Sequence, residues 1–239
     1  MEFASTEEQE MIRDTAASFL AEVSDSEAIR RAMATEQGYD GELWQRICGE
    51  MYWQAIHIPE EYGGMGLGYV ELVAVLEQMG RHLLCSPFYS TVCLGANALL
   101  VAGSEAQKEQ FLTAIAAGEL TATLAWTSPG GRWDAQAVQV TAEARDGGYV
   151  LDGELRYVPD GHTAGLVIVA ARRPGSTGEE GVSLFAIPAD TAGIEREWLP
   201  TMDQTRRQAS VRLHQVSVDA ASLMGAEGEG WPLLARTLQ

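Results

Sequence analysis

The chain has 239 residues, of which 46% are hydrophobic, and this is enough apolar material for a sizeable core in one or two domains. Its formal net charge is −18, from 34 acidic and 16 basic residues. So acidic a chain argues against binding to nucleic acid or to an anionic membrane. No apolar run reaches membrane-spanning length, and the acidic start Met1-Glu2-Phe3 is unlike a signal peptide. We therefore expect a cytoplasmic protein.

Common metal and phosphate motifs are missing from the sequence. The three cysteines, Cys48, Cys85 and Cys93, are odd in number and lack metal-site spacing, so we interpret them as small buried residues in a reducing compartment. The histidines show no ligand spacing either, and no metal site is predicted. The glycine cluster Gly63–Gly66 is not followed by Lys and Ser or Thr, which excludes a P-loop.

The first half of the chain has the period of amphipathic helices. Ser5-Thr6-Glu7-Glu8 predicts a capping box, in which the Ser5 hydroxyl and the Glu8 carboxylate satisfy backbone N–H groups. Ser104-Glu105-Ala106-Gln107 predicts a second one. One intervening helix is predicted to align Tyr69, Leu72, Val73, Leu76 and Met79 on one face. We therefore predict an all-helical domain over residues 1–118.

Residues 119–224 show the alternation and turns of β-strands. Val138–Ala144 alternates with period two, and Asp146-Gly147-Gly148 predicts a tight turn into the next strand. Gly165–Ala171 is a continuous apolar run, which predicts a strand buried on both faces. The predicted fold class is α+β: a helical domain followed by an antiparallel β-barrel or sandwich domain. Residues 225–239 are predicted to begin a further helix.

Three segments resemble the acyl-CoA dehydrogenase family. Trp126-Thr127-Ser128-Pro129-Gly130 stands where that family has a Thr-Glu-Pro-Gly loop. Asp152-Gly153 with Leu155–Asp160 stands where it has Asn-Gly, then Lys, Trp, Ile, Thr and Asn. Ile58–Gly68 is similar to a loop of its helical domain. The resemblance implies FAD as the cofactor and an acyl-CoA as the substrate, which loses an α-proton to a carboxylate and a β-hydride to the flavin.

The resemblance implies a flavin site that agrees only in part with the family. Its residues here would be Trp126, Thr127, Ser128, Tyr157 and Pro159. Tyr157 keeps an aromatic ring against the flavin, whereas Ser128 replaces the usual Glu. Pro159 replaces a threonine that hydrogen-bonds flavin N5, and proline has no hydroxyl or N–H to donate. Without the resemblance, Trp126 and Tyr157 also fit a simpler role as aromatic residues of a β core.

Arg132-Trp133-Asp134 stands where the family has Gly-Ser-Asp, whose small residues let the backbone approach the FAD pyrophosphate. Arg132 and Trp133 are bulkier and oppose that approach, although Arg132 could itself pair with a phosphate. We predict both as substrate-binding residues. Further along, Arg206-Arg207 fits either a solvated surface pair or a phosphate ligand.

The resemblance covers the first two of the family's three domains. The third, a C-terminal four-helix domain that supplies the catalytic glutamate, is expected to be missing, so no catalytic residue is assigned to this chain. Whether the chain is a fragment or a naturally short subunit stays open. We expect a homo- or hetero-oligomer with another acyl-CoA dehydrogenase subunit. The possible functions are an FAD-linked dehydrogenase subunit, a non-catalytic scaffold subunit without flavin, and a flavin-dependent monooxygenase relative.

Overall fold

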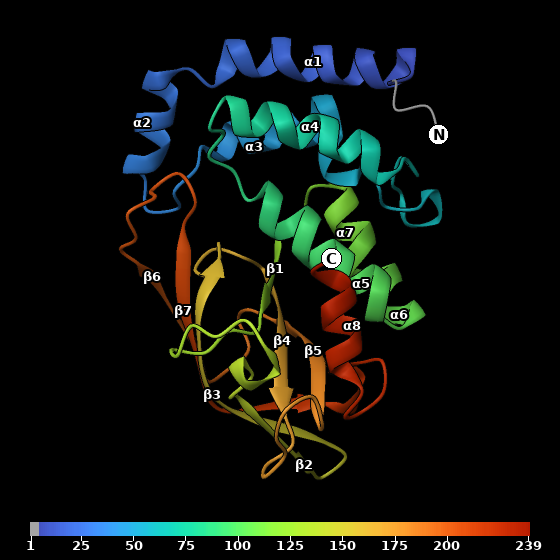
Figure 1. Cartoon of the computed structure of the whole chain (residues 1–239), viewed down its shortest axis with the longest axis vertical. Coiled ribbons are helices and arrows are strands. Elements are labelled where there is room, and N and C mark those ends of the chain that lie inside the picture. The colour runs from blue at the N-terminus through green and yellow to red at the C-terminus, as the bar shows by residue number, and fades with distance from the viewer. Residues whose placement is uncertain (1–4) are drawn as a thin grey trace.

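The computed structural model describes residues 5–239 and places the helices at one end of an elongated molecule and the β-sheet at the other (Figure 1). The α-helices are α1 (Glu7–Val23), α2 (Ser26–Ala34), α3 (Gly41–Arg46), α4 (Tyr69–Arg81), α5 (Asn97–Ala102), α6 (Glu105–Gln107), α7 (Thr113–Ala116) and α8 (Gly230–Thr237). Wider π-helical turns extend α3 over Ile47–Met51 and precede α5 over Tyr89–Ala96. The predicted α+β class and the predicted helix after residue 225 are confirmed.

Helix α1 begins one residue later than the predicted capping box requires. Thr6 is the N-cap: its hydroxyl accepts from the Gln9 N–H at 3.2 Å, and the Gln9 side chain accepts from the Thr6 N–H at 3.0 Å. The prediction for Ser5 and Glu8 is therefore wrong, because Thr-x-x-Gln satisfies the same pattern one position further on. The second box forms as predicted, between Ser104 and Gln107.

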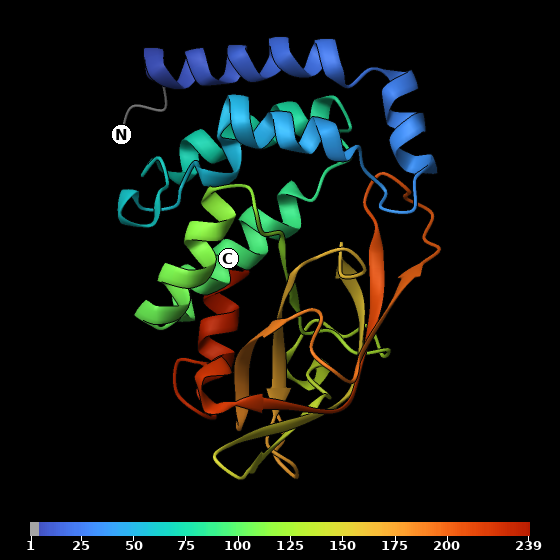
Figure 2. The ribbon, with the colours of Figure 1, turned by 180° about the vertical axis from the view of Figure 1, so that it is seen from behind.

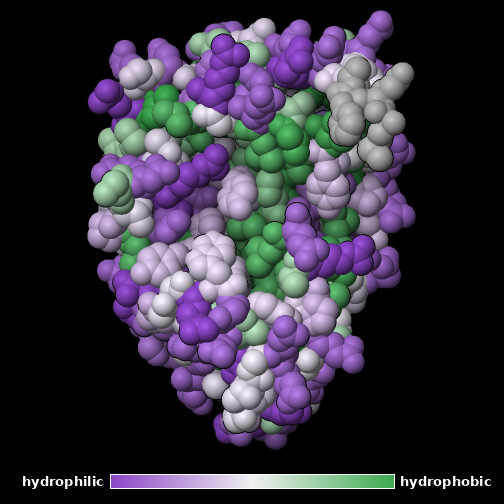
Figure 3. Space-filling view, viewed as in Figure 1, coloured by the Kyte–Doolittle hydropathy of each residue, from purple (hydrophilic) through white to green (hydrophobic). Residues whose placement is uncertain are grey.

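Helix α4 packs on α1 through a narrower stripe than the sequence predicts. Leu72, Val75 and Met79 are buried with residues of α1 and α3. Tyr69 and Val73 are exposed, so their predicted inward placement is wrong. The spacing of the three buried residues defines the stripe, and Tyr69 and Val73 lie to one side of it. An apolar band runs down the middle of the face in Figure 3, where α4, α5 and α8 lie in the same view of Figure 1.

The strands form one mostly antiparallel sheet in the order β6-β7-β3-β2-β4-β5-β8, with β1 paired to β4. Their bounds are β1 (Ala122–Ala125), β2 (Thr141–Arg145), β3 (Gly148–Pro159), β4 (Leu166–Arg172), β5 (Val182–Pro188), β6 (Ile194–Leu199), β7 (Gln208–Asp219) and β8 (Leu223–Met224). The pairing of β1 with β4 is parallel, which corrects the antiparallel prediction for the first apolar run. Asp146 and Gly147, both with positive φ, form the predicted tight turn between β2 and β3.

Strand β4 is buried on both faces, as predicted, and joins two cores. Leu166, Ile168 and Ala170 pack with residues of the helical half, including Leu99 and Ile115. Val167, Val169 and Ala171 pack among the other strands. The helix before α5 also closely approaches β1, because a Cβ on Gly95 would lie 2.5 Å from the Ala122 Cβ. Figures 1 and 2 show α8 returning alongside the helices, so both ends of the chain contact the helical half.

Within residues 5–239, the structure contains no helix with both the length and the apolar character needed to cross a membrane.

Candidate flavin-type cavity

A cavity of about 530 Å³ lies where the end of β1, strand β3 and the helical turns before α5 meet. Its volume is typical of sites for small molecules. The cavity is lined by Tyr89, Leu94, Leu124, Trp126, Thr127, Gly131, Trp133, Tyr157, Pro159, Gln208 and Leu238. This lining holds no charged side chain. It brings together Trp126, Thr127, Trp133, Tyr157 and Pro159 from the predicted site, while Ser128 and Arg132 are not part of it.

Two tryptophans, Trp126 and Trp133, line this cavity, and a third, Trp231, packs against Trp126. The ring of Trp126 lies edge-on to that of Trp133, with 5.4 Å between centroids, and 6.4 Å from that of Trp231 at the start of α8. Trp126 is buried and belongs to the core, so it serves both as a core aromatic and as a cavity wall. Trp133 is 80% exposed and stands at the mouth. The sequence analysis missed the contact between Trp126 and Trp231, because Trp231 lies far from the motifs in the chain.

A bulge in β3 directs Tyr157 toward the cavity. The register of β3 against β7 shifts between Leu155 and Val158, and Tyr157 adopts a left-handed φ of 59°. Such bulges re-aim side chains, often beside functional sites. Thr127 anchors the bulge: its hydroxyl donates to the Arg156 carbonyl, and the Arg156 N–H donates to the Thr127 carbonyl at 2.9 Å. Thr127 therefore holds Tyr157 in place, and its hydroxyl is already engaged.

Pro159 offers the cavity no hydrogen-bond donor. Its carbonyl accepts from the Thr123 hydroxyl at 2.6 Å, and its ring nitrogen carries no hydrogen. Gln208 lies opposite Pro159 in the β3–β7 pairing, and it also lines the cavity. In the described part of the chain its carboxamide forms no side-chain hydrogen bond, so Gln208 is an unengaged donor at the cavity that the sequence analysis missed.

Neither Ser128 nor Arg132 lines the cavity. Ser128 is enclosed by other residues, and Arg132 is paired with Asp134. Ser128 is 1% exposed, and its hydroxyl has no partner among residues 5–239. The Arg132 guanidinium donates to Asp134 from Nε at 3.0 Å and from a second nitrogen, and this ion pair lowers the pKa of the Asp134 carboxyl. The pairing leaves Arg132 less available to a phosphate than the sequence predicts.

Arg207 is 4% exposed, so its interpretation as a surface residue is wrong. One guanidinium nitrogen donates to the carbonyls of Met33 at 2.6 Å and Thr35 at 3.1 Å, at the end of α2. The guanidinium carbon lies 3.7 Å from the centroid of the Trp198 ring. Arg207 thus clamps α2 to the sheet rather than binding a phosphate. Arg206 is half-buried and lies over the Tyr89 ring.

Asp160 is a buried carboxyl directly after Pro159. The Ser90 hydroxyl donates to it at 2.7 Å. Burial raises its pKa to about 6, although the Ser90 hydrogen bond and the positive charge of Arg206 favour the ionised form. The sequence analysis did not single it out, because its burial depends on contact between the two halves of the chain.

These residues fit one part of FAD and not the others. The uncharged, aromatic lining suits a planar ring, with Tyr157 exposed beside it. No donor stands at Pro159 for the ring nitrogen N5. Trp133 stands where the family resemblance implies a small residue at the pyrophosphate, and Arg132 beside it is paired with Asp134. The cavity therefore has the character of a flavin-ring site that lacks these two supporting features.

Two protein-family models match this chain. The model for the acyl-CoA dehydrogenase N-terminal domain matches residues 6–119, and the model for the acyl-CoA dehydrogenase middle domain matches residues 123–216. The chain belongs to the acyl-CoA dehydrogenase family, a family of FAD-dependent oxidoreductases.

Individual relatives agree with this placement. The acyl-CoA dehydrogenase FadE12 of Mycobacterium tuberculosis is 30% identical over 236 residues, which are 94% of this chain and 58% of that protein. Mitochondrial isovaleryl-CoA dehydrogenase of Pongo abelii is 29% identical, over 94% of this chain and 54% of its own length. The chain thus spans little more than half the length of these curated relatives.

Two solved structures are similar over almost the whole chain. Butyryl-CoA dehydrogenase from Megasphaera elsdenii superposes with a TM-score of 0.89 at 25% identity, covering 100% of this chain and 63% of that one. The ChsE4-ChsE5 complex from Mycobacterium tuberculosis superposes with a TM-score of 0.85 at 26% identity, covering 99% of this chain and 61% of the other.

Proposed function

We propose that this chain is a subunit of an acyl-CoA dehydrogenase-type oxidoreductase, and that its aromatic cavity receives the flavin ring of FAD during α,β-dehydrogenation of an acyl-CoA. The observation that carries the proposal is the convergence of Trp126, Thr127 and Tyr157, from two separate motifs, on one uncharged cavity. Family membership supports it. The acyl-CoA, the carboxylate base and a second dehydrogenase subunit are parts of the same proposal.

In this function the residues of the chain position a ring and exclude water. Trp126 and Tyr157 would pack on the ring, and the Thr127–Arg156 hydrogen bonds would hold the bulge that presents Tyr157. FAD would supply the hydride acceptor when bound. The donor that the ring nitrogen lacks at Pro159 could come only from another residue, and Gln208 lies opposite it.

A second candidate is a non-catalytic partner subunit that holds a dehydrogenase subunit and no flavin. Pro159 without a donor and Arg132 paired with Asp134 favour it. The chain is also similar in structure to a complex of two proteins, ChsE4 and ChsE5.

An absorbance spectrum of the protein purified without added cofactor tests the proposal, combined with its intact mass and a titration with FAD. Oxidised-flavin bands, or saturable binding of FAD that Tyr157→Ala weakens, support the flavin site. A colourless protein that binds no FAD at concentrations of tens of micromolar contradicts it. Co-purification of a second, yellow chain would then favour the partner subunit.

A further inference from the structure

A second pocket lies on the helical half, apart from the flavin-type cavity. It has a volume of about 380 Å³ and forms where α2, the end of α4 and the loop between β6 and β7 meet. Figures 1 and 2 both show α2 directly beside that loop. The pocket is lined by Ser24, Ser26, Ile29, Arg30, Met33, Arg81, His82, Leu83 and Thr205.

Every ionisable side chain that lines this pocket is a base, in a chain of net charge −18. Within residues 5–239, Arg30 and Arg81 form no salt bridge and no side-chain hydrogen bond, whereas Arg31 and Arg46 pair with Glu27 and Glu50. Arg30, Arg81 and His82 thus line one pocket, and within residues 5–239 none of their side chains pairs with a carboxylate.

The carboxylates at the start of α2 and beside Thr205 are engaged with their own segments. Asp25 accepts from the backbone N–H groups of Glu27 and Ala28 at the start of α2. Asp203 accepts from the N–H and the hydroxyl of Thr205. The two arginines are therefore the free charges of the pocket, and guanidinium groups bind carboxylate and phosphate oxygens in pairs.

Apolar side chains accompany the charges. Ile29 and Met33 of α2 line the pocket together with Leu83. Leu83 is 56% exposed and has a φ of 47°, in the left-handed region that a bulky residue rarely adopts. This conformation holds an apolar side chain at the rim of the pocket. A ligand that fits the pocket has an anionic end and an apolar stem.

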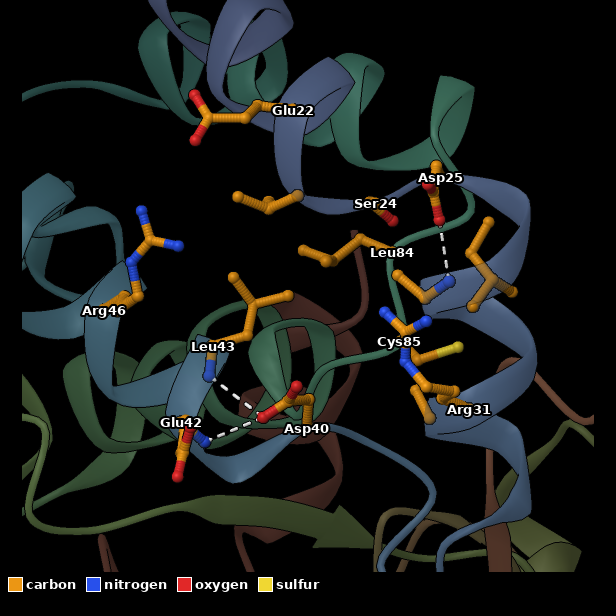
Figure 4. A pocket seen from close by; sticks show the side chains of 14 residues that line it. Glu22, Ser24, Asp25, Arg31, Asp40, Glu42, Leu43, Arg46, Leu84 and Cys85 are labelled. Atoms are coloured by element: carbon orange, nitrogen blue, oxygen red, sulfur yellow. Dashed lines mark hydrogen bonds between the residues drawn. The ribbon is translucent and has the colours of Figure 1, made fainter.

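The adjoining pocket, drawn in Figure 4, has a different set of charged side chains from the pocket at Arg30 and Arg81. It has a volume of about 330 Å³ and shares Ser24 and Ile29 with the pocket at Arg30 and Arg81. Its lining includes two arginines, but also the four acids Glu22, Asp25, Asp40 and Glu42. These acids would repel an anion, so the neighbouring pocket carries no such site.

We propose that the pocket at Arg30 and Arg81 binds an oxyanion, a phosphate or carboxylate group, carried on a short apolar stem. The two guanidinium groups hold the oxyanion. Ile29, Met33 and Leu83 cover the stem. The site is separate from the flavin-type cavity and does not depend on the proposed function.

Titration calorimetry on the full 239-residue chain tests this site with four probes: hexyl phosphate, hexanoate, inorganic phosphate and hexanol. At least one of the two hexyl anions is expected to bind more tightly than both inorganic phosphate and hexanol, and the tighter anion identifies the oxyanion. Arg30→Gln and Arg81→Gln are each expected to weaken that anion about tenfold, because each removes a charge-assisted hydrogen bond.

Arg145→Gln is the matched control, since Arg145 is exposed and paired with Glu143 on β2. It is expected to leave the affinity unchanged. All three variants replace exposed arginines, and equal unfolding temperatures would show that they fold. The proposal is overturned if hexanol binds as tightly as the anions, if neither anion binds, or if Arg30→Gln and Arg81→Gln bind like the control.

Discussion

The Ser90 hydroxyl and the Asp160 carboxylate form a hydrogen bond of 2.7 Å between residues that lie 70 positions apart in the chain. Ser90 belongs to the helical half, and Asp160 follows the last residue of β3. Both side chains are buried, so the bond joins the two halves where water does not compete.

Asp160 is expected to make the protein more stable in mild acid. Its pKa is about 6 in the fold against an ordinary value of 3.8, so the folded state holds the proton more tightly than the unfolded state. Well below pH 3.8 the carboxyl is protonated in both states and costs nothing, whereas ionisation above pH 6 costs about 3 kcal/mol. Asp160→Asn keeps an acceptor for Ser90 and should be more stable at pH 7.5.

Urea unfolding of both proteins from pH 4 to pH 8 measures this effect. The difference in stability between Asp160→Asn and the unaltered chain should grow as the pH rises from 4 to 6 and then level off. Parallel curves would show that Asp160 titrates alike in both states. Ser90→Ala, which removes the donor, should lower stability most above pH 6.

The Arg207 clamp is expected to contribute measurably to stability. Arg207→Met keeps much of the apolar stem but loses the hydrogen bonds to the Met33 and Thr35 carbonyls, so it should lower the free energy of unfolding by about 1–3 kcal/mol. Arg207→Lys should be nearly as unstable, because an ammonium group cannot both stack on Trp198 and reach both carbonyls. Thermal and urea unfolding give these values. An Arg207→Lys variant as stable as the unaltered chain would contradict the clamp.

Gly38 is expected to tolerate no side chain. It has a φ of +81°, and a Cβ there would lie 2.2 Å from the Arg207 Cγ. Gly147 has a φ of +80° but nothing within 4 Å of its Cβ position, which makes Gly147→Ala a control for backbone strain alone. We expect about 1–2 kcal/mol of destabilisation for Gly147→Ala and a further 1–3 kcal/mol for Gly38→Ala. Equal losses would mean that Arg207 moves aside freely.

Pro159→Thr is expected to strengthen binding of FAD by about tenfold relative to Pro159→Val, if the cavity takes the flavin ring. Threonine and valine have the same shape and both restore an N–H, but only threonine adds a hydroxyl where the family resemblance implies a donor to N5. Quenching of flavin fluorescence measures both affinities. Equal affinities for the two variants would show that the hydroxyl makes no contact with the ring.

Local patterns in the sequence predict much of the fold. The apolar run Gly165–Ala171 predicts a strand buried on both faces, and Asp146-Gly147 predicts a hairpin turn, because both depend on residues that are neighbours in the chain. The same holds for the Ser104–Gln107 capping box. The parallel pairing of β1 with β4 does not follow from such patterns, because it depends on which distant strand lies beside it.

The residues of the candidate site also divide into those that local motifs predict and those that only distant contacts bring together. The motifs predict Trp126, Thr127 and Tyr157, which do line one cavity. They do not predict the bulge that turns Tyr157, since it arises from the register with β7. Gln208 could not be found from local patterns, because it reaches the site from a distant part of the chain. The burial of Arg207 likewise depends on the end of α2, which lies about 170 residues earlier in the chain.

Strand β4 gives alternate side chains to two different cores, one shared with the helices and one within the sheet. Neither core can open without disturbing the backbone of the strand that they share. The helical and β halves should therefore unfold in a single cooperative transition, with no intermediate in which only one half has melted. A chain cut after residue 118 would leave the helices without the surface of β4 against which Leu99 and Ile115 pack.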